Sequence, residues 1–123
     1  MIIAVDFDGV LVRSAFPKIG EPDHEMVDLV RLLIQKPGVE VILWTSRVDQ
    51  PLEDAIAWCE RMGLVFDATN DNAPSNKRKY GKLYPNGTRK VYADYYLDDH
   101  NMGYNRSTAI DIISSILREE DVK

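Results

Sequence analysis

The chain has little cysteine and little histidine, and it lacks a long apolar run. Of its 123 residues, one is cysteine and two are histidine. A single thiol, Cys59, excludes an internal disulfide and a zinc site built from several cysteines. No apolar run approaches the ~18 residues of a membrane-spanning helix. The sequence starts directly with strand-like residues, without the pattern of a signal peptide. We therefore expect a cytoplasmic protein with no membrane partner.

Positive charge is also scarce. The chain has 20 acidic and 15 basic residues, and its net charge is −5. A chain of this charge is not a general nucleic-acid binder. The apolar content of 45% is ordinary for a globular protein. The length is enough for one domain with one core, which we place at residues 1–123.

Strand-like and helical patterns alternate along the chain. Apolar runs predict strands at 2–7, 39–44, 64–68 and 93–99. Apolar residues at helical spacing predict helices between the first and second strands, between the second and third, and after the fourth. This alternation favours an α/β fold with a parallel sheet of about four strands and helices on both faces. The remaining segments, 8–22 and 69–89, are expected to be loops.

Polar side chains follow three of the predicted strands. Asp6 and Asp8 end the first, the segment 45–47 (Thr-Ser-Arg) follows the second, and Asp98 and Asp99 end the fourth. In parallel sheets, ligands bind at the carboxyl ends of the strands, so these groups are expected to converge. Four carboxylates in one crevice repel each other unless a cation lies between them. Oxygen ligands of this kind favour Mg²⁺.

These motifs resemble those of the haloacid-dehalogenase-like (HAD) superfamily of phosphohydrolases. The stretch "DFDGV" at 6–10 is similar to its first motif, and "VILWTSR" at 41–47 is similar to its second. "YYLDD" at 95–99 is similar to the acidic motif that ends its last strand. The short chain is most similar to small bacterial and phage members without a cap domain. The resemblance implies a HAD-like, Rossmann-like sheet with strand order 4-1-2-3.

The resemblance also implies a role for each motif residue. Asp6 would be the nucleophile that forms an aspartyl-phosphate, and Asp8 would be the general acid and base. Thr45 would donate a hydrogen bond to the phosphoryl group. Lys90 would be the phosphate-binding lysine. The Mg²⁺ ligands would be Asp6, the backbone carbonyl of Asp8, Asp98 and Asp99, and residues near the substrate would be Gly9, Ser46 and Arg47.

Two of these assignments have alternatives within the chain. Lys77, Lys79 and Lys82 precede Lys90 in a basic segment, and each is a second choice for the phosphate-binding lysine. Arg47 either contacts the substrate or pairs with a surface acid. The basic segment either attracts a macromolecular phosphate, such as a nucleic-acid end, or is a solvated loop.

The sequence supports one function above two others. The predicted function is a Mg²⁺-dependent phosphatase that acts on a small phosphorylated metabolite or a macromolecular phosphate end. The alternative is a non-catalytic domain that binds phosphate or a partner. A signalling receiver domain also carries aspartates, a hydroxyl and a lysine, but its motifs follow the strands in a different order.

Overall fold

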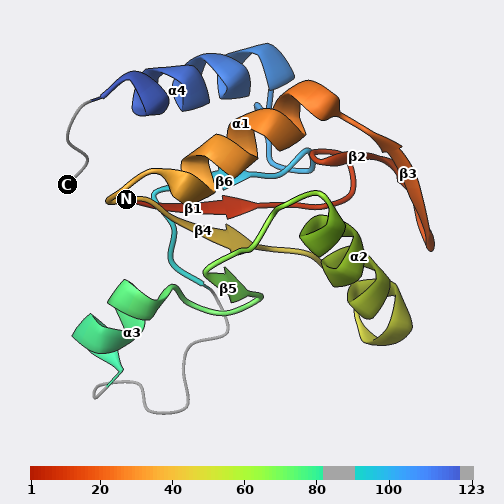
Figure 1. Ribbon diagram of the computed structural model, residues 1–123, viewed down its shortest axis with the longest axis horizontal. Coiled ribbons are helices and arrows are strands. Elements are labelled where there is room, and N and C mark those ends of the chain that lie inside the picture. The colour runs from red at the N-terminus through yellow and green to blue at the C-terminus, as the bar shows by residue number, and fades with distance from the viewer. Residues whose placement is uncertain (82–90, 120–123) are drawn as a thin grey trace.

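The computed structural model describes residues 1–81 and 91–119, which form ten helices and strands (Figure 1). None of the helices in these residues combines the length and the apolar character that a membrane span requires. In chain order the elements are β1 (Ile2–Val5), β2 (Val12–Ala15), β3 (Lys18–Pro22), α1 (His24–Gln35), β4 (Glu40–Leu43), α2 (Asp49–Arg61), β5 (Ala68–Thr69), α3 (Pro74–Tyr80), β6 (Tyr95–Leu97) and α4 (Arg106–Arg118).

A parallel sheet of four strands forms the centre of the chain. Its order is β5-β4-β1-β6, and its strands pair in parallel. Val5, the last residue of β1, pairs with Leu43 of β4 and with Leu97 of β6. Three strands therefore end at the same level, and the residues that follow them lie at one edge of the sheet. This confirms the parallel α/β sheet.

The order of the strands differs in its labels from the predicted 4-1-2-3. The prediction had no strand between the first sheet strand and the first helix, whereas the structure has the antiparallel hairpin β2–β3 there. Because the hairpin strands are counted as β2 and β3, the second, third and fourth predicted strands are β4, β5 and β6. Segment 8–22, expected to be a loop, therefore contains regular structure.

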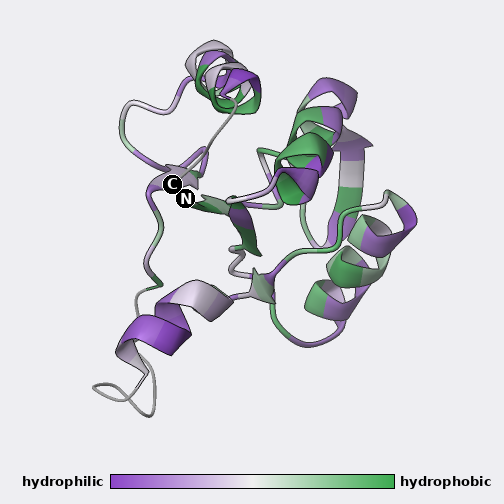
Figure 2. Cartoon of the chain, turned by 60° about the vertical axis from the view of Figure 1, so that its left-hand side comes forward, coloured by the Kyte–Doolittle hydropathy of each residue, from purple (hydrophilic) through white to green (hydrophobic). Residues whose placement is uncertain are grey.

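The two faces of the sheet are covered unequally. Side chains of α1, α2 and α4 pack on the face that carries Ile3 and Val5 of β1, and form the larger core with them. Ile2 and Ala4 point to the other face, where they pack with Ala73 and other residues outside the helices. Helix α3 contributes no buried side chain, and Figure 2 shows it with hydrophilic residues along most of its length. Helices therefore pack mainly against one face of the sheet, whereas the sequence predicted helices on both faces.

Several predicted boundaries were wrong. The third strand, predicted at 64–68, is two residues long and begins at Ala68, the last residue of the predicted segment. The fourth strand, β6, is shorter than the predicted 93–99. Helix α3 lies in a segment expected to be a loop. Helices α1 and α2 lie where the apolar spacing predicted them, and Asn105 caps α4 by accepting a hydrogen bond from the backbone N–H of Thr108.

Candidate functional site

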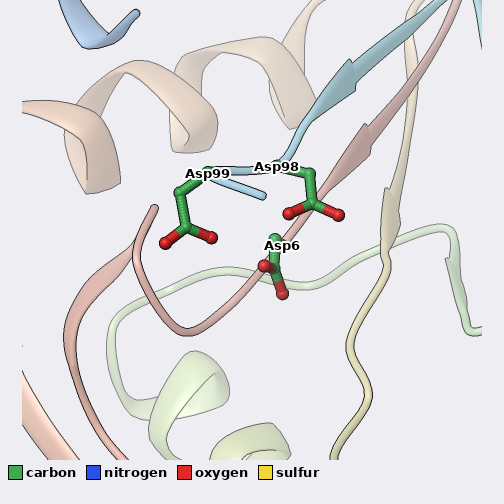
Figure 3. Close-up of side chains that lie close together, drawn as sticks. All are labelled: Asp6, Asp98 and Asp99. Atoms are coloured by element: carbon green, nitrogen blue, oxygen red, sulfur yellow. The ribbon is translucent and has the colours of Figure 1, made fainter. Parts of the chain in front are cut away.

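Three carboxylates meet at the carboxyl edge of the sheet. Asp6 follows β1, and Asp98 and Asp99 follow β6, the neighbouring strand. The backbone N–H of Asp6 donates to the carbonyl of Leu97 at 2.8 Å, which fixes the two strand ends side by side. One oxygen from each of the three carboxylates lies within 4.8 Å of the others (Figure 3). Oxygens at this spacing can hold one cation.

The surroundings of Asp6 disfavour a negative charge. Burial, together with repulsion from Asp98, Asp99 and Asp8, raises the pKa of Asp6 from 3.8 to about 7. A hydrogen bond from the backbone N–H of Phe7 opposes this rise. The cluster therefore holds more negative charge than its environment stabilises. A bound cation would offset that excess.

The loop after β6 holds Asp98 by its backbone. The carboxylate of Asp98 accepts a hydrogen bond from the N–H of His100 at 2.9 Å, and its carbonyl accepts one from Asn101 at 3.0 Å. The side-chain amide of Asn101 donates to the carbonyl of Tyr96 at 3.3 Å. Asn101 thus ties the loop to the strand before it. Asp99 is the more exposed acid of the pair and lies 3.7 Å from the exposed ring of His100.

Gly9 makes room for Asp99. Its φ is +87°, a conformation that side chains rarely adopt, and a Cβ added here would lie 2.1 Å from Oδ2 of Asp99. A residue other than glycine would therefore displace the carboxylate or the turn. The resemblance to the HAD-like superfamily implies that Gly9 lies near the substrate. The structure adds that only glycine leaves room for the carboxylate of Asp99 at this position.

Asp8 does not join the three-carboxylate cluster. Its two oxygens accept hydrogen bonds from Nε and Nη2 of Arg47, both at 2.8 Å. The side chain of Arg47 is buried, with 1% of its surface exposed. Pairing with Asp8 raises the pKa of Arg47. Arg47 therefore forms an ion pair, but its partner is Asp8 of the first motif and not the surface acid that was one of its two predicted partners.

Thr45 and Ser46 follow β4 at the same edge of the sheet. The hydroxyl oxygen of Thr45 accepts a hydrogen bond from the N–H of Arg47 at 3.1 Å, and the N–H of Thr45 donates to the side chain of Asn70 at 2.8 Å. Ser46 is exposed. Asn70 follows β5 and was not singled out from the sequence. The only feature of the sequence that could have indicated Asn70 is that it follows a predicted strand, as the other site residues do.

The assignment of a phosphate-binding lysine stays a prediction. Lys90 and Lys82 lie outside the described residues. Lys77 forms an ion pair with Asp71, and the ammonium group of Lys79 lies 5.3 Å from the ring centre of Tyr80. Neither of these two lysines has a described contact with the acidic cluster.

One solved structure is closely similar to this chain. It is the structure of a conserved protein from Bacteroides thetaiotaomicron, and it shares 34% sequence identity with a TM-score of 0.75. The match covers 94% of this chain and 91% of the other. No protein-family model matches the chain, and no curated protein matches it.

Proposed function

The chain belongs to the same family as the conserved Bacteroides thetaiotaomicron protein, and from its own residues we propose that it is a Mg²⁺-dependent phosphohydrolase of the HAD-like superfamily. The observation that carries the proposal is the convergence of Asp6, Asp98 and Asp99 within 4.8 Å. An acidic cluster alone is common on protein surfaces. Here the cluster lies at the end of a parallel sheet, where ligands of such folds bind, and follows two adjacent strands.

The proposed metal ligands are all oxygen atoms. Asp6, Asp98 and Asp99 would hold the ion, together with the backbone carbonyl of Asp8. Mg²⁺ prefers oxygen ligands and is usually bound by one or two carboxylates, water and a phosphate. When bound, it would neutralise the charge of the carboxylates and of the substrate phosphate.

In the proposed reaction, Asp6 is the nucleophile. Its carboxylate attacks phosphorus, a bond forms between Asp6 and the phosphoryl group, and the bond to the leaving alcohol breaks. Asp8 gives a proton to that alcohol. In the second step Asp8 takes a proton from water, which attacks phosphorus and releases phosphate and free Asp6. A carboxylate has about four lone-pair sites, and Arg47 occupies two of those on Asp8, so the others are open to a proton.

Thr45 is proposed to bind the phosphoryl group. Its hydroxyl oxygen accepts the N–H of Arg47, and this orients the hydroxyl hydrogen away from that contact. The hydrogen is then available to a phosphoryl oxygen. A partly buried, fixed donor of this kind stabilises charge that develops in the transition state.

A second candidate is a domain that binds phosphate without turnover. The observation that favours it is that both Asp8 oxygens already accept hydrogen bonds from Arg47 within the chain. The substrate classes for the first candidate are small phosphorylated metabolites and macromolecular phosphate ends. Both candidates share the same acidic cluster.

The test is hydrolysis of p-nitrophenyl phosphate with Mg²⁺ and with a chelator in its place. The wild-type protein should need the metal, and Asp6→Asn should lose several powers of ten in kcat. Asp111→Asn is the matched control, since Asp111 is exposed on α4. Retention of more than about a tenth of kcat by Asp6→Asn would exclude it as the nucleophile.

A parallel screen separates the two candidates and narrows the substrate. Phosphorylated metabolites and oligonucleotides with a 3′ or a 5′ phosphate are each incubated with the protein and Mg²⁺. Release of phosphate from any of them supports the enzyme. Binding of phosphate without release from any substrate supports the second candidate and contradicts the first.

A further inference from the structure

Arg47 has every N–H group occupied. An arginine carries five N–H donors, one on Nε and two on each terminal nitrogen. Nε and Nη2 donate to the two oxygens of Asp8, and Nη2 also donates to the carbonyl of Lys18 at 2.9 Å. Nη1 donates to the carbonyls of Pro17 at 3.1 Å and Pro51 at 3.3 Å. Five donors therefore meet five acceptor contacts within the chain.

The guanidinium is also enclosed by two aromatic rings. Its central carbon lies 5.1 Å from the ring centre of Phe7 and 5.2 Å from that of Phe16. Phe7 is fully buried beside Asp6, whereas Phe16 is 61% exposed at the turn of the hairpin β2–β3. The hairpin turn therefore covers the guanidinium from outside, through one ring and two carbonyls.

These contacts leave no N–H of Arg47 for a substrate phosphate. Substrate binding would require Arg47 to give up bonds to Asp8 or to three backbone carbonyls. Loss of these partners would leave a buried charge without compensation, which is strongly destabilising. The position two residues after Thr45 left a substrate contact open, but the burial of the side chain argues for another role.

We infer that Arg47 is a positioning residue that holds the carboxylate of Asp8 and the hairpin turn 16–18 in fixed places beside the acidic cluster. This inference rests on the proposed function, because it gives Asp8 the acid–base role. A two-bond contact with a planar guanidinium fixes both the distance and the plane of a carboxylate. Arg47 thus acts on the reaction through Asp8 and does not touch the substrate.

The inference makes Arg47 and Asp8 one unit, and a double-mutant cycle tests this. The variants are Arg47→Met, Asp8→Asn and the double variant, each assayed with p-nitrophenyl phosphate and Mg²⁺. Each single variant should lower kcat by about 10²–10⁴-fold, the range of general acid–base catalysis. The double variant should lose less than about threefold beyond Asp8→Asn, because the unit is already broken. A further tenfold loss in the double variant would overturn the inference.

Two further measurements separate positioning from substrate binding. KM, and the dissociation constant of inorganic phosphate measured by calorimetry, should change by less than about threefold in Arg47→Met. A tenfold weakening of either would show that Arg47 contacts phosphate, and would overturn the inference. Arg47→Lys keeps the charge but lacks the planar fork, so it should restore stability without restoring kcat.

A rapid-mixing experiment gives a signature that a general loss of stability would not produce. In Asp8→Asn, phosphoenzyme formation from an aryl phosphate should survive better than its hydrolysis, because the leaving group needs little protonation. A burst of nitrophenolate followed by slow turnover is expected, and Arg47→Met should show the same burst. A lower rate without a burst in Arg47→Met, beside a burst in Asp8→Asn, would overturn the inference.

The same set of variants also shows whether a loss of activity is due to a failure to fold. Arg47→Met leaves the charge of Asp8 without its partner, whereas the double variant removes both charges. If Arg47→Met does not fold, the comparison of Asp8→Asn with the double variant still decides the inference. Absence of turnover in the wild-type protein would contradict the proposed function. Additive losses in an active enzyme would contradict only the role of Arg47.

Discussion

Gly9 and Asp99 are in contact so close that a single methyl group would not fit between them. A Cβ on residue 9 would lie 2.1 Å from Oδ2 of Asp99. The first motif and the last motif of the chain are therefore packed against each other. This contact links the turn after β1 to the exposed acid of the cluster.

Gly9→Ala should weaken Mg²⁺ binding. The added methyl group would push Asp99 away, and the φ of +87° would add backbone strain of about 1–3 kcal/mol. Calorimetric titration with Mg²⁺ and urea unfolding measure the two effects. Gly103→Ala is the matched control, because Gly103 has a φ of +83° and no atom within 4 Å of an added Cβ. Equal loss of Mg²⁺ affinity in both variants would contradict the contact.

The stability of the metal-free protein should fall as the pH rises toward neutral. Burial, with Asp98 beside it, raises the pKa of Asp6 from 3.8 to about 7. Between these values the folded chain keeps a proton that the unfolded chain has released, so folding is favoured at low pH and this contribution is lost as the pH rises through the folded value. Urea midpoints at about pH 5 and about pH 8, measured without metal, test this.

Two controls assign that pH trend to Asp6. Asp6→Asn cannot ionise and should show a smaller fall in midpoint between the two pH values. Mg²⁺ added at the higher pH should recover stability in the wild-type protein, because it binds the ionised cluster of the folded state. An unchanged trend in Asp6→Asn would assign the effect to other groups.

Asp23 should contribute to stability in two separable ways. It caps α1 by accepting the N–H of Met26 at 3.2 Å, and it accepts two hydrogen bonds from Arg106 at the start of α4. Asp23→Ala loses both, and the lost cap alone costs about 1 kcal/mol. Asp23→Asn keeps a capping oxygen and loses the ion pair, so it should cost less. Urea unfolding of both variants gives the comparison.

The charge of Asp23 adds a salt and pH dependence. Hydrogen bonding to Arg106 lowers the pKa of Asp23, so its contribution is present above the unfolded value and is lost as the pH falls through the folded value. The guanidinium of Arg106 is about half exposed, and high salt should screen the pair. If Arg106→Gln lowers the midpoint equally in low and high salt, charge is not the reason.

Cys59 should not react in the folded protein. The thiol is buried against the core, and burial raises its pKa to about 12. Iodoacetamide should label Cys59 in urea but not in buffer, as mass spectrometry would show. Cys59→Ser would bury a hydroxyl at a cost of about 1–3 kcal/mol, and Cys59→Ala serves as the apolar control. Labelling of the folded protein at the unfolded rate would contradict the core position.

The sequence predicted the acidic cluster because local signals define it. An apolar run followed by Asp6, and another followed by Asp98 and Asp99, indicate two strand ends, and parallel pairing brings strand ends together. The hairpin β2–β3 gave no such signal. Most of its side chains are exposed, so no alternation of apolar and polar residues marks its strands, and backbone hydrogen bonds hold it.

The partner of Arg47 could not be read from the sequence for a similar reason. Asp8 lies 39 residues away along the chain, and the hairpin turn that helps to bury Arg47 is also distant in sequence. A charged residue after a strand is usually exposed, so the sequence left two roles open for Arg47, a substrate contact and a pairing with a surface acid. β5 was misplaced because Leu64 is buried without belonging to a strand. Burial alone does not identify a strand.

The hairpin turn meets Arg47 mainly through main-chain oxygens, those of Pro17 and Lys18. Any amino acid supplies a carbonyl, so the identity of residue 18 is only weakly constrained by this contact. The length of the turn is strongly constrained, because one residue more or fewer would move both carbonyls out of register with the guanidinium. Relatives of this chain should therefore vary at residue 18 and keep the residue count of the turn, so gaps in an alignment should fall elsewhere.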